Sequence, residues 1–166
     1  QRTGVCNAAE SLVVHDSVAD EFLPAALKAL NELGVELRGC EVTQQHGTFV
    51  KPATADDFYE EYLGMILAVK VVQSFDEAVD FINEHSSSHT ESIVSNHHPR
   101  VMEFTRRIDS ACVHVNCSTR FSDGGEYGLG AEIGISTDKL HARGPMGLKE
   151  LTTLKWVCLG EGQIRE

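Results

Sequence analysis

Hydrophobic positions in the first part of the chain follow two alternating patterns. Residues 12–14 form a short apolar run that predicts a strand. Apolar residues then recur every three or four positions through residues 18–33, where Asp16 or Ser17 can cap the start of a helix. Residues 35–37 predict a second strand directly after this helix. A strand, a helix and a second strand in this order indicate a parallel sheet.

The same alternation continues through the middle of the chain. Residues 41–55 show no clear period and are expected to be mostly loop, with a short strand at 48–51. Ser74 or Asp76 is the expected cap of the next helix. Further strands are expected at 66–72, 92–95 and 111–116, and further helices at 74–84 and 99–108. The short connections favour an α/β fold with a mostly parallel sheet.

The pattern changes after residue 116. Residues 117–136 contain five glycines and several hydroxyl groups but little apolar periodicity, which is typical of a binding loop that follows a strand. Pro145 is expected to begin a short helix over residues 145–151, and residues 152–159 alternate like a terminal strand. We therefore divide the chain into a main α/β domain at 1–151 and a C-terminal strand and tail at 152–166.

Composition restricts the classes of function. The 166 residues suit one domain with a sizeable core. The formal net charge of -11, without a local basic cluster, argues against nucleic acid as a partner. No apolar run approaches the roughly 20 residues of a membrane span. Five scattered cysteines indicate a reducing, cytoplasmic compartment, and the start at Gln1 indicates a piece of a longer protein.

Cys6 is the first candidate for chemistry. It lies in a turn of small residues before the first apolar run, where a helix start and its backbone N–H groups would favour the nucleophilic thiolate. A helix dipole supplies only about 0.3–1 kcal/mol, whereas lowering a thiol pKa from about 8.5 to 7 needs roughly 2 kcal/mol. Further help is expected from Arg2, from backbone N–H groups or from protein outside this chain. The alternative is a buried, inert structural cysteine.

Two other kinds of site find less support. His97 and His98 are adjacent, so their side chains diverge, and Cys112 and Cys117 lack the Cys-x-x-Cys spacing of zinc sites. We therefore expect no metal. The sequence GGEYGLG at 124–130 lacks the order of a dinucleotide-binding loop, and turn chemistry explains its glycines better.

Hydrogen-bond donors gather after the last predicted strand of the main domain. Amide, hydroxyl and guanidinium groups follow one another there, and an arginine binds a carboxylate or a phosphate through two parallel hydrogen bonds. The residues are Asn116, Ser118, Thr119 and Arg120. They predict an anion site, and the alternative is a structural arginine that ties down the glycine-rich loop.

Three long stretches carry a resemblance to a known family. They read RTGVCNAAESLVVH from Arg2, VNCSTRFSDGGEYGLGAEIGIS from Val115 and STDKLHARGPMGLKELTTLKW from Ser136. Across essentially the whole chain, they closely resemble the gamma-glutamyl phosphate reductases, also called glutamate-5-semialdehyde dehydrogenases, of proline biosynthesis. The aldehyde dehydrogenases are more distant relatives, which EEYLG at 60–64 also resembles.

The resemblance implies a reaction and roles for several residues. Members of the family reduce gamma-glutamyl phosphate with NADPH, giving glutamate 5-semialdehyde and phosphate. Cys6 matches the nucleophile, which would expel phosphate and hold the glutamyl group as a thioester until hydride reduces it. Glu61 falls where aldehyde dehydrogenases bind the nicotinamide ribose, although Leu63 stands where many of them have phenylalanine.

The remaining signature residues would serve the substrate. The N-x-S-T-R-F stretch that begins at Asn116 would hold the α-carboxylate of the glutamyl group or the departing phosphate. His141 and Arg143 belong to the HARGP stretch, and they either contact the substrate or pack the loop.

The resemblance also implies what surrounds this chain. The fold would be the three-layer sandwich of an aldehyde-dehydrogenase-like catalytic domain, whereas the NADPH-binding domain would lie mainly before Cys6 and outside this chain. The chain alone would then be inactive. Residues 152–159 would help to join subunits of a homo-oligomer, and glutamate 5-kinase is a candidate partner. The alternatives are another acyl-phosphate or aldehyde dehydrogenase of the superfamily, or a non-catalytic assembly module.

Overall fold

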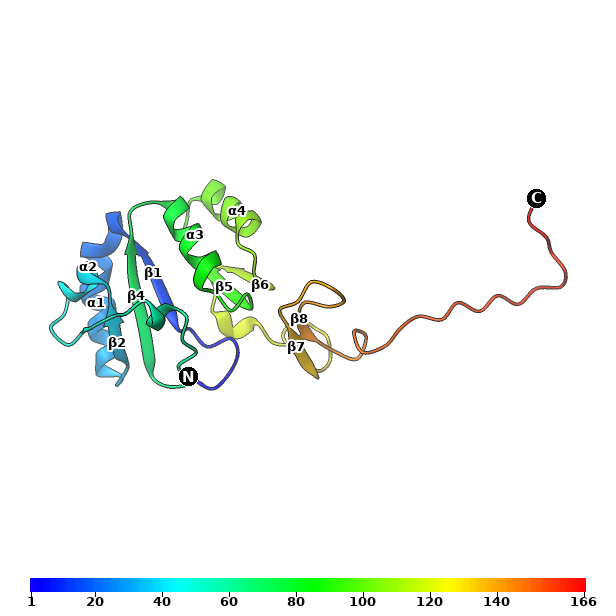
Figure 1. Cartoon of the computed structure of the whole chain (residues 1–166), viewed down its shortest axis with the longest axis horizontal. Coiled ribbons are helices and arrows are strands. Elements are labelled where there is room, and N and C mark those ends of the chain that lie inside the picture. The colour runs from blue at the N-terminus through cyan, green and yellow to red at the C-terminus, as the bar shows by residue number, and fades with distance from the viewer.

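Four parallel strands form the main sheet of the computed structural model, which describes residues 1–166. Their order across the sheet is β1-β4-β2-β3, so β4 lies between the two strands that α1 connects (Figure 1). Leu12 on β1 faces Val69 on β4, and Leu37 on β2 faces Leu67 on β4. The strands are β1 (Ser11–His15), β2 (Glu36–Gly39), β3 (Lys51–Pro52) and β4 (Ile66–Val72).

Helices cover both faces of this sheet. Figure 1 shows α1 and α2 on one side of β1 and β4, and α3 and α4 on the other side. Leu23 and Leu27 of α1 are fully buried against Val14, Leu37 and Val69, which stand on one face of the sheet. The helices are α1 (Asp16–Glu32), α2 (Glu41–Gln44), α3 (Phe75–His85) and α4 (His98–Arg107). The expected α/β fold with three layers is therefore confirmed.

A second, smaller parallel sheet pairs β5 (Thr90–Ile93) with β6 (Cys112–Val115). Its own apolar cluster joins Val79 of α3 with Phe104 and Ile108, at the end of α4. An antiparallel hairpin follows, made of β7 (Gly134–Ser136) and β8 (Gly144–Met146). Single-turn 3-10 helices, η1 (Asp56–Phe58) and η2 (Thr119–Phe121), complete the elements.

Element boundaries differ from the expectations mainly at caps. The helix expected at 18–33 starts at Asp16, because His15 rather than Asp16 or Ser17 caps it, its Nδ1 accepting from Ser17 N–H at 3.1 Å. Ser74 caps α3 as expected, since its Oγ accepts from Glu77 N–H at 3.1 Å. The region 41–55 holds the short helix α2 as well as loop, and the strands near 48–51, 92–95 and 111–116 are shifted or shortened by a few residues.

The expected helix at 145–151 is wrong. Pro145 and Met146 belong to β8, whose main chain pairs with Ile135 and Gly134. Only a turn follows, in which Leu151 N–H donates to Leu148 carbonyl oxygen at 3.3 Å. A proline tolerates both the first turn of a helix and an edge strand, so the available partner strand decided the outcome.

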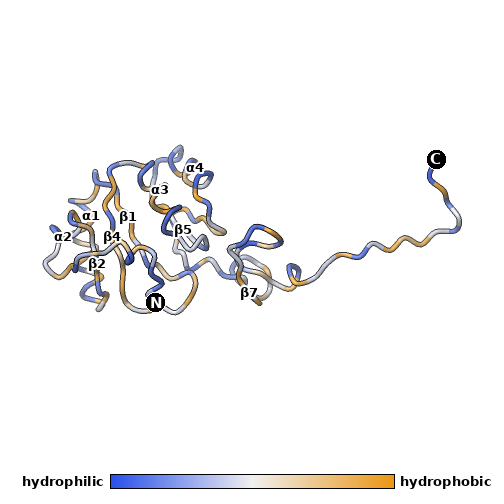
Figure 2. Tube along the Cα trace, in the orientation of Figure 1, coloured by the Kyte–Doolittle hydropathy of each residue, from blue (hydrophilic) through white to orange (hydrophobic).

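Residues 152–166, here called the C-terminal arm, extend away from the body (Figure 1). No strand forms at 152–159, where one was expected. Leu154, Trp156 and Leu159 are 88%, 88% and 94% exposed, and Figure 2 shows hydrophobic segments recurring along the arm. The strand expectation fails in this chain because a β-strand needs a neighbouring strand for its hydrogen bonds, and no strand of the body pairs with the arm.

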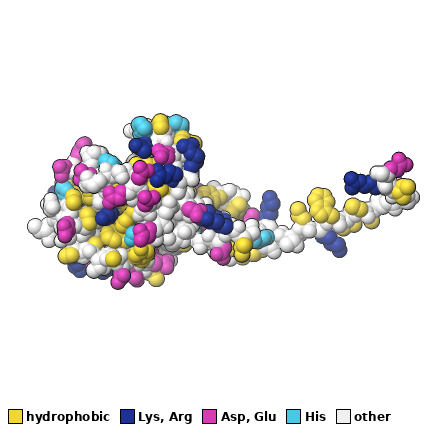
Figure 3. Space-filling view, turned by 45° about the horizontal axis from the view of Figure 1, so that its top comes forward, with side chains coloured by type: hydrophobic (Ala, Val, Ile, Leu, Met, Phe, Trp, Pro, Cys, Tyr) yellow, Lys and Arg dark blue, Asp and Glu magenta, His cyan; other side chains and the backbone are white.

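None of the helices combines the length and hydropathy that a bilayer crossing requires. Figure 3 shows acidic side chains spread over the body and hydrophobic ones along the arm.

Candidate active site

Cys6 lies in a turn at residues 3–7, between the N-terminus and β1, which we call the cysteine turn, and its side chain is exposed. The expected helix start is absent here, because β1 follows this turn and α1 begins only at Asp16. Partial desolvation by the protein beneath it, and then the charge of Glu132, raise the pKa of the Cys6 thiol. A backbone hydrogen bond, as expected, and then Arg120 act to lower it. Arg2, named as a possible source of activation, is not among the charges that act on this thiol.

The loop after β6 that carries Ser118, Thr119 and Arg120 is here called the donor-rich loop. Three hydrogen bonds connect it to Asn7, the residue after Cys6. Asn7 is 4% exposed, and its Nδ2 donates to Ser122 carbonyl oxygen at 2.9 Å. Thr119 Oγ1 donates to Asn7 carbonyl oxygen at 2.7 Å, and Arg120 Nη1 donates to Asn7 Oδ1. The cysteine turn and the loop after β6 therefore form one site, although more than a hundred residues separate them in sequence.

The signature donors do not all face this site. Thr119 and Arg120 contact Asn7 directly, and Ser118 begins η2 by accepting Arg120 N–H at its Oγ (3.2 Å). Asn116 instead bridges to the start of another loop, where its Oδ1 accepts Ser95 N–H at 2.8 Å and its Nδ2 donates to Ser95 carbonyl oxygen at 3.0 Å. Both ends of the Asn116 amide are thus already engaged by protein backbone.

Glu61 lies on an exposed loop beside the N-terminal segment. Thr3 Oγ1 donates to Leu63 carbonyl oxygen at 3.4 Å, which joins this loop to the cysteine turn. Glu61 also lies close enough to Glu10 to affect its ionisation: burial, then Glu61 and Glu60, raise the pKa of Glu10 to about 7. Glu10 was not identified from the sequence, because its environment comes from a loop fifty residues away.

Asp57 anchors the loop that carries Glu61. Its side chain is 7% exposed, and Arg38 Nη1 donates to its Oδ1 at 2.5 Å while Tyr62 hydroxyl donates to the same oxygen at 3.0 Å. Thr54 supplies two further donors to Oδ2, at 2.7 and 2.9 Å. Burial alone would raise the pKa of Asp57, but Arg38 and Thr54 hold it well below the usual range of a carboxyl group.

His141 and Arg143 are engaged in loop contacts. His141 Nε2 lies 2.6 Å from Glu150 carbonyl oxygen, within hydrogen-bonding distance. Arg143 reaches Asp109, donating from Nη1 to Oδ1 at 3.0 Å and from Nη2 to the carbonyl oxygen at 2.7 Å. The bonds from Arg143 hold the β7–β8 hairpin against the connection between α4 and β6, whereas the His141 contact stays between the hairpin loop and the turn after β8.

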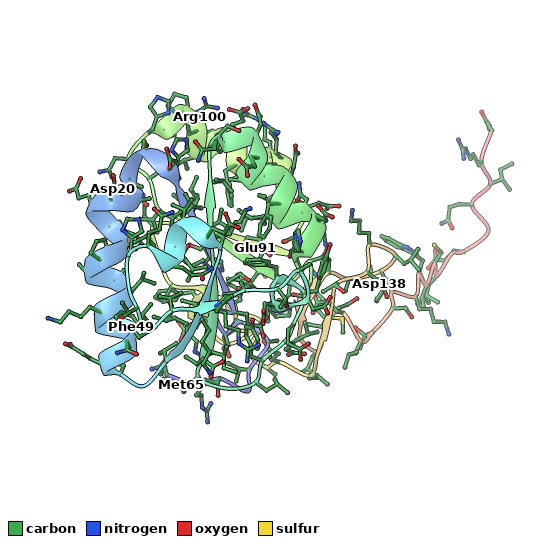
Figure 4. All side chains as sticks on the ribbon, turned by 60° about the vertical axis from the view of Figure 1, so that its left-hand side comes forward. Asp20, Phe49, Met65, Glu91, Arg100 and Asp138 are labelled. Atoms are coloured by element: carbon green, nitrogen blue, oxygen red, sulfur yellow. The ribbon has the colours of Figure 1, made fainter.

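A buried polar cluster beneath the cysteine turn escaped the sequence analysis. Ser122, His114 and His89 are 1%, 8% and 3% exposed, and Ser122 is hydrogen-bonded directly to His114 and, through Thr90, to His89. Glu91, the next residue after Thr90, is also interior: Figure 4 shows it within the body beside α3, whereas Asp138 lies out on the hairpin loop. The only sequence signal for this cluster was His114 within the strand expected at 111–116, because His89, Thr90 and Ser122 all lay outside the expected strands.

Known proteins resemble this chain in sequence. The model of the aldehyde dehydrogenase family matches residues 35–157. The chain is 57% identical over 166 residues to the gamma-glutamyl phosphate reductase of Dictyoglomus turgidum, and 59% identical over 165 residues to that of Heliobacterium modesticaldum. It covers 40% of the length of each of these curated relatives.

Solved structures give the same picture. The crystal structure of gamma-glutamyl phosphate reductase from Thermotoga maritima superposes with a TM-score of 0.93 at 54% identity, over the whole of this chain and 40% of that one. A betaine aldehyde dehydrogenase from Staphylococcus aureus matches 70% of this chain with a TM-score of 0.55 at 13% identity, which shows a shared fold alone.

Proposed function

This chain belongs to the aldehyde dehydrogenase family, and from that premise we propose that it is the cysteine-bearing catalytic part of a gamma-glutamyl phosphate reductase. The whole enzyme would reduce gamma-glutamyl phosphate to glutamate 5-semialdehyde and phosphate, with NADPH as the reductant, in proline biosynthesis. Identities of 57–59% to relatives with that name support the proposal. Since the chain covers 40% of those relatives, the activity belongs to the longer protein.

The observation that carries the proposal is the set of hydrogen bonds between the cysteine turn and the donor-rich loop. Asn7 accepts hydrogen bonds from Thr119 and Arg120 and donates to Ser122, so the Cys6 thiol and the Arg120 guanidinium border one place. A nucleophile beside a cation suits a substrate that is both an acyl donor and an anion.

In the proposed reaction the Cys6 thiolate attacks the acyl carbon of the acyl phosphate. The carbon–oxygen bond to phosphate breaks, phosphate leaves with the bonding electron pair, and the glutamyl group remains on sulfur as a thioester. NADPH, when bound by the full-length enzyme, would supply the hydride needed to reduce this acyl group to the aldehyde, and the sulfur would leave as thiolate. The thiol then returns to its starting state.

Arg120 is the proposed anchor for the anionic parts of the substrate. Its Nη1 and Nε donate to Asn7 and, at 3.4 Å, to Gln1, while Nη2 donates to no protein atom. A carboxylate or a phosphate oxygen is the natural acceptor for the remaining guanidinium hydrogens. Thr119 and Ser118 shape the turn around it, and Asn116 contributes by fixing the end of β6 to Ser95.

The chain offers NADPH only part of a site. The exposed carboxylate of Glu61 can accept hydrogen bonds from ribose hydroxyls, which is the role proposed for it. Its acidic neighbours Glu60 and Glu10 would repel the phosphates of a dinucleotide. Those phosphates therefore require a part of the enzyme that lies beyond this chain.

Ionisation of the Cys6 thiol also requires a part of the enzyme that lies beyond this chain. Burial and Glu132 raise the pKa of Cys6, so little thiolate exists at neutral pH in this chain. We propose that the chain is inactive alone and that the full enzyme brings further positive charge or N–H donors to the sulfur.

The proposal extends to assembly and location. The C-terminal arm, with Leu154 and Trp156 exposed, would pair with another subunit of a homo-oligomer or dock on the cofactor domain. Glutamate 5-kinase, whose product is this acyl phosphate, would be a partner. A cytoplasmic location is part of the proposal, and five unpaired cysteines support it.

The test uses the full-length enzyme in the oxidative direction. Glutamate 5-semialdehyde, phosphate and NADP⁺ should give phosphate-dependent NADPH formation, which Cys6→Ser should abolish and Cys40→Ser should retain. Turnover of simple aldehydes at the same efficiency would favour another dehydrogenase of the superfamily. Full activity of Cys6→Ser would favour the non-catalytic assembly module for this domain.

A further inference from the structure

Ser122 is the centre of a buried chain of hydrogen bonds. Its hydroxyl, in a residue 1% exposed, accepts from Thr90 Oγ1 at 2.7 Å. The same oxygen lies 2.9 Å from His114 Nε2 and 3.3 Å from the hydroxyl of Tyr127. Thr90 Oγ1 in turn lies 2.6 Å from His89 Nδ1.

The number of protons available in this hydrogen-bond network assigns the tautomer of His89. A threonine hydroxyl has one proton, and that of Thr90 is donated to Ser122. The contact between Thr90 and His89 therefore requires the proton on Nδ1 of the imidazole. Burial lowers the pKa of His89, which agrees with a neutral ring, and Nε2 is left as a buried acceptor without a partner.

The hydrogen-bond network reaches the cysteine turn. Ser122 is the residue whose carbonyl oxygen accepts the side chain of Asn7 at 2.9 Å, and Asn7 directly follows Cys6. Three hydrogen-bonded steps thus lead from the imidazole through Thr90 and Ser122 to Asn7. The hydroxyls of Thr90 and Ser122 are hydrogen-bonded to each other, and His89 contacts the Thr90 end of this path while Asn7 contacts the Ser122 carbonyl oxygen at the other end.

We propose that His89 is a positioning residue for Cys6, acting through its Nδ1–H, Thr90 and Ser122 on the Asn7 side chain that fixes the cysteine turn. This inference rests on the proposed function, in which Cys6 is the nucleophile. A network that only stabilised the core would affect unfolding, whereas a positioning network also affects the reactivity of the sulfur. The orphan Nε2 is not required for the role.

Matched variants separate these possibilities in the full-length enzyme. His89→Asn keeps an N–H donor near the position of Nδ1 but lacks Nε2, whereas His89→Leu removes both nitrogens. Thr90→Ser keeps the relaying hydroxyl, and Thr90→Val removes it at nearly the same volume. The readouts are kcat, the KM for NADP⁺ and the rate at which iodoacetamide alkylates Cys6 as a function of pH.

We expect His89→Leu and Thr90→Val to lower kcat and the alkylation rate roughly ten- to a hundredfold, with the KM for NADP⁺ unchanged within twofold. His89→Asn and Thr90→Ser should restore both rates to within about threefold of the natural enzyme. If His89→Leu fails to fold, the comparison of Thr90→Val with Thr90→Ser tests the positioning role by itself.

Two results would overturn the role of His89. One is that His89→Leu and Thr90→Val have the kcat and the Cys6 alkylation rate of the natural enzyme, while only their melting temperatures fall. The other is that His89→Asn is as impaired as His89→Leu, which would assign the function to Nε2. If the natural enzyme shows no phosphate-dependent oxidation, the proposed function fails, and the alkylation rates still test the positioning of Cys6.

Discussion

Arg120 donates a hydrogen bond from Nη1 to Oδ1 of Asn7, a residue 113 positions earlier in the chain. This bond places a guanidinium at the residue that follows Cys6, and Thr119 reinforces it by donating to Asn7 carbonyl oxygen at 2.7 Å. The catalytic proposal depends on this relationship, because neither segment makes a site without the other.

Replacing Arg120 by lysine should weaken binding of the acyl substrate in the full-length enzyme. Lysine keeps the positive charge but lacks the planar fork with which Arg120 donates to Asn7 from one nitrogen and can bind an anion with another. The KM for glutamate 5-semialdehyde should rise roughly tenfold, with the KM for NADP⁺ unchanged. Arg106→Lys, on the exposed side of α4, is the matched control. Unaltered substrate kinetics would exclude this role for Arg120.

The reactivity of Cys6 should differ between this chain and the whole enzyme. In the isolated chain the raised pKa keeps the sulfur protonated at pH 7, so its alkylation rate should keep increasing with pH beyond the range of an ordinary thiol. In the full-length enzyme Cys6 should react with iodoacetamide faster than Cys40 and Cys158, as measured by peptide mass spectrometry. Equal rates for the three cysteines there would refute its assignment as nucleophile.

Glu10 should make the chain less stable as pH rises. Its pKa is raised to about 7 in the folded state from an ordinary value of 4.5, so the folded state binds this proton more tightly than the unfolded one. Stability is lost as pH increases between these values. Glu10→Gln should therefore gain roughly 1 kcal/mol in urea unfolding at pH 8 and little at pH 4.5. Glu161→Gln in the arm is the control, and an equal gain there would contradict this account.

Asp57 should contribute stability of the opposite pH dependence. Its pKa is depressed, so its contribution is complete above the ordinary carboxyl value and is lost progressively as pH falls below about 4. Asp57→Asn removes the ion pair with Arg38 and should cost about 2 kcal/mol in urea unfolding at pH 7. A variant as stable as the natural chain at pH 7 would mean that this pair is not important.

Trp156, the only tryptophan, reports on the C-terminal arm. It is 88% exposed, so its fluorescence in the isolated chain should resemble that of indole in water, and removing residues 152–166 should leave the stability of the body unchanged. In the full-length oligomer the emission should shift to shorter wavelength as the ring becomes buried. An unshifted spectrum there would count against the arm as an interface.

Local patterns in the sequence were sufficient for most of the elements. The three- and four-residue spacing of Leu23, Leu27 and Leu30 predicts α1, and the apolar run at 66–72 predicts β4, because both patterns reflect which side of one element is buried. The resemblance of long stretches to one family identified Cys6 and Arg120 as candidates. The helix expected at 145–151 and the strand expected at 152–159 failed where the outcome depended on a partner strand.

Tertiary structure alone decided the relations among distant segments. The sequence does not contain the insertion of β4 between β1 and β2, the engagement of Asn116 by Ser95, or the carboxylates that surround Glu10. Nor does it reveal the buried path from His89 to Asn7. Periodicity records how each residue faces its own element, whereas hydrogen-bond partners, desolvation and pKa shifts arise from atoms that only the folded chain brings together.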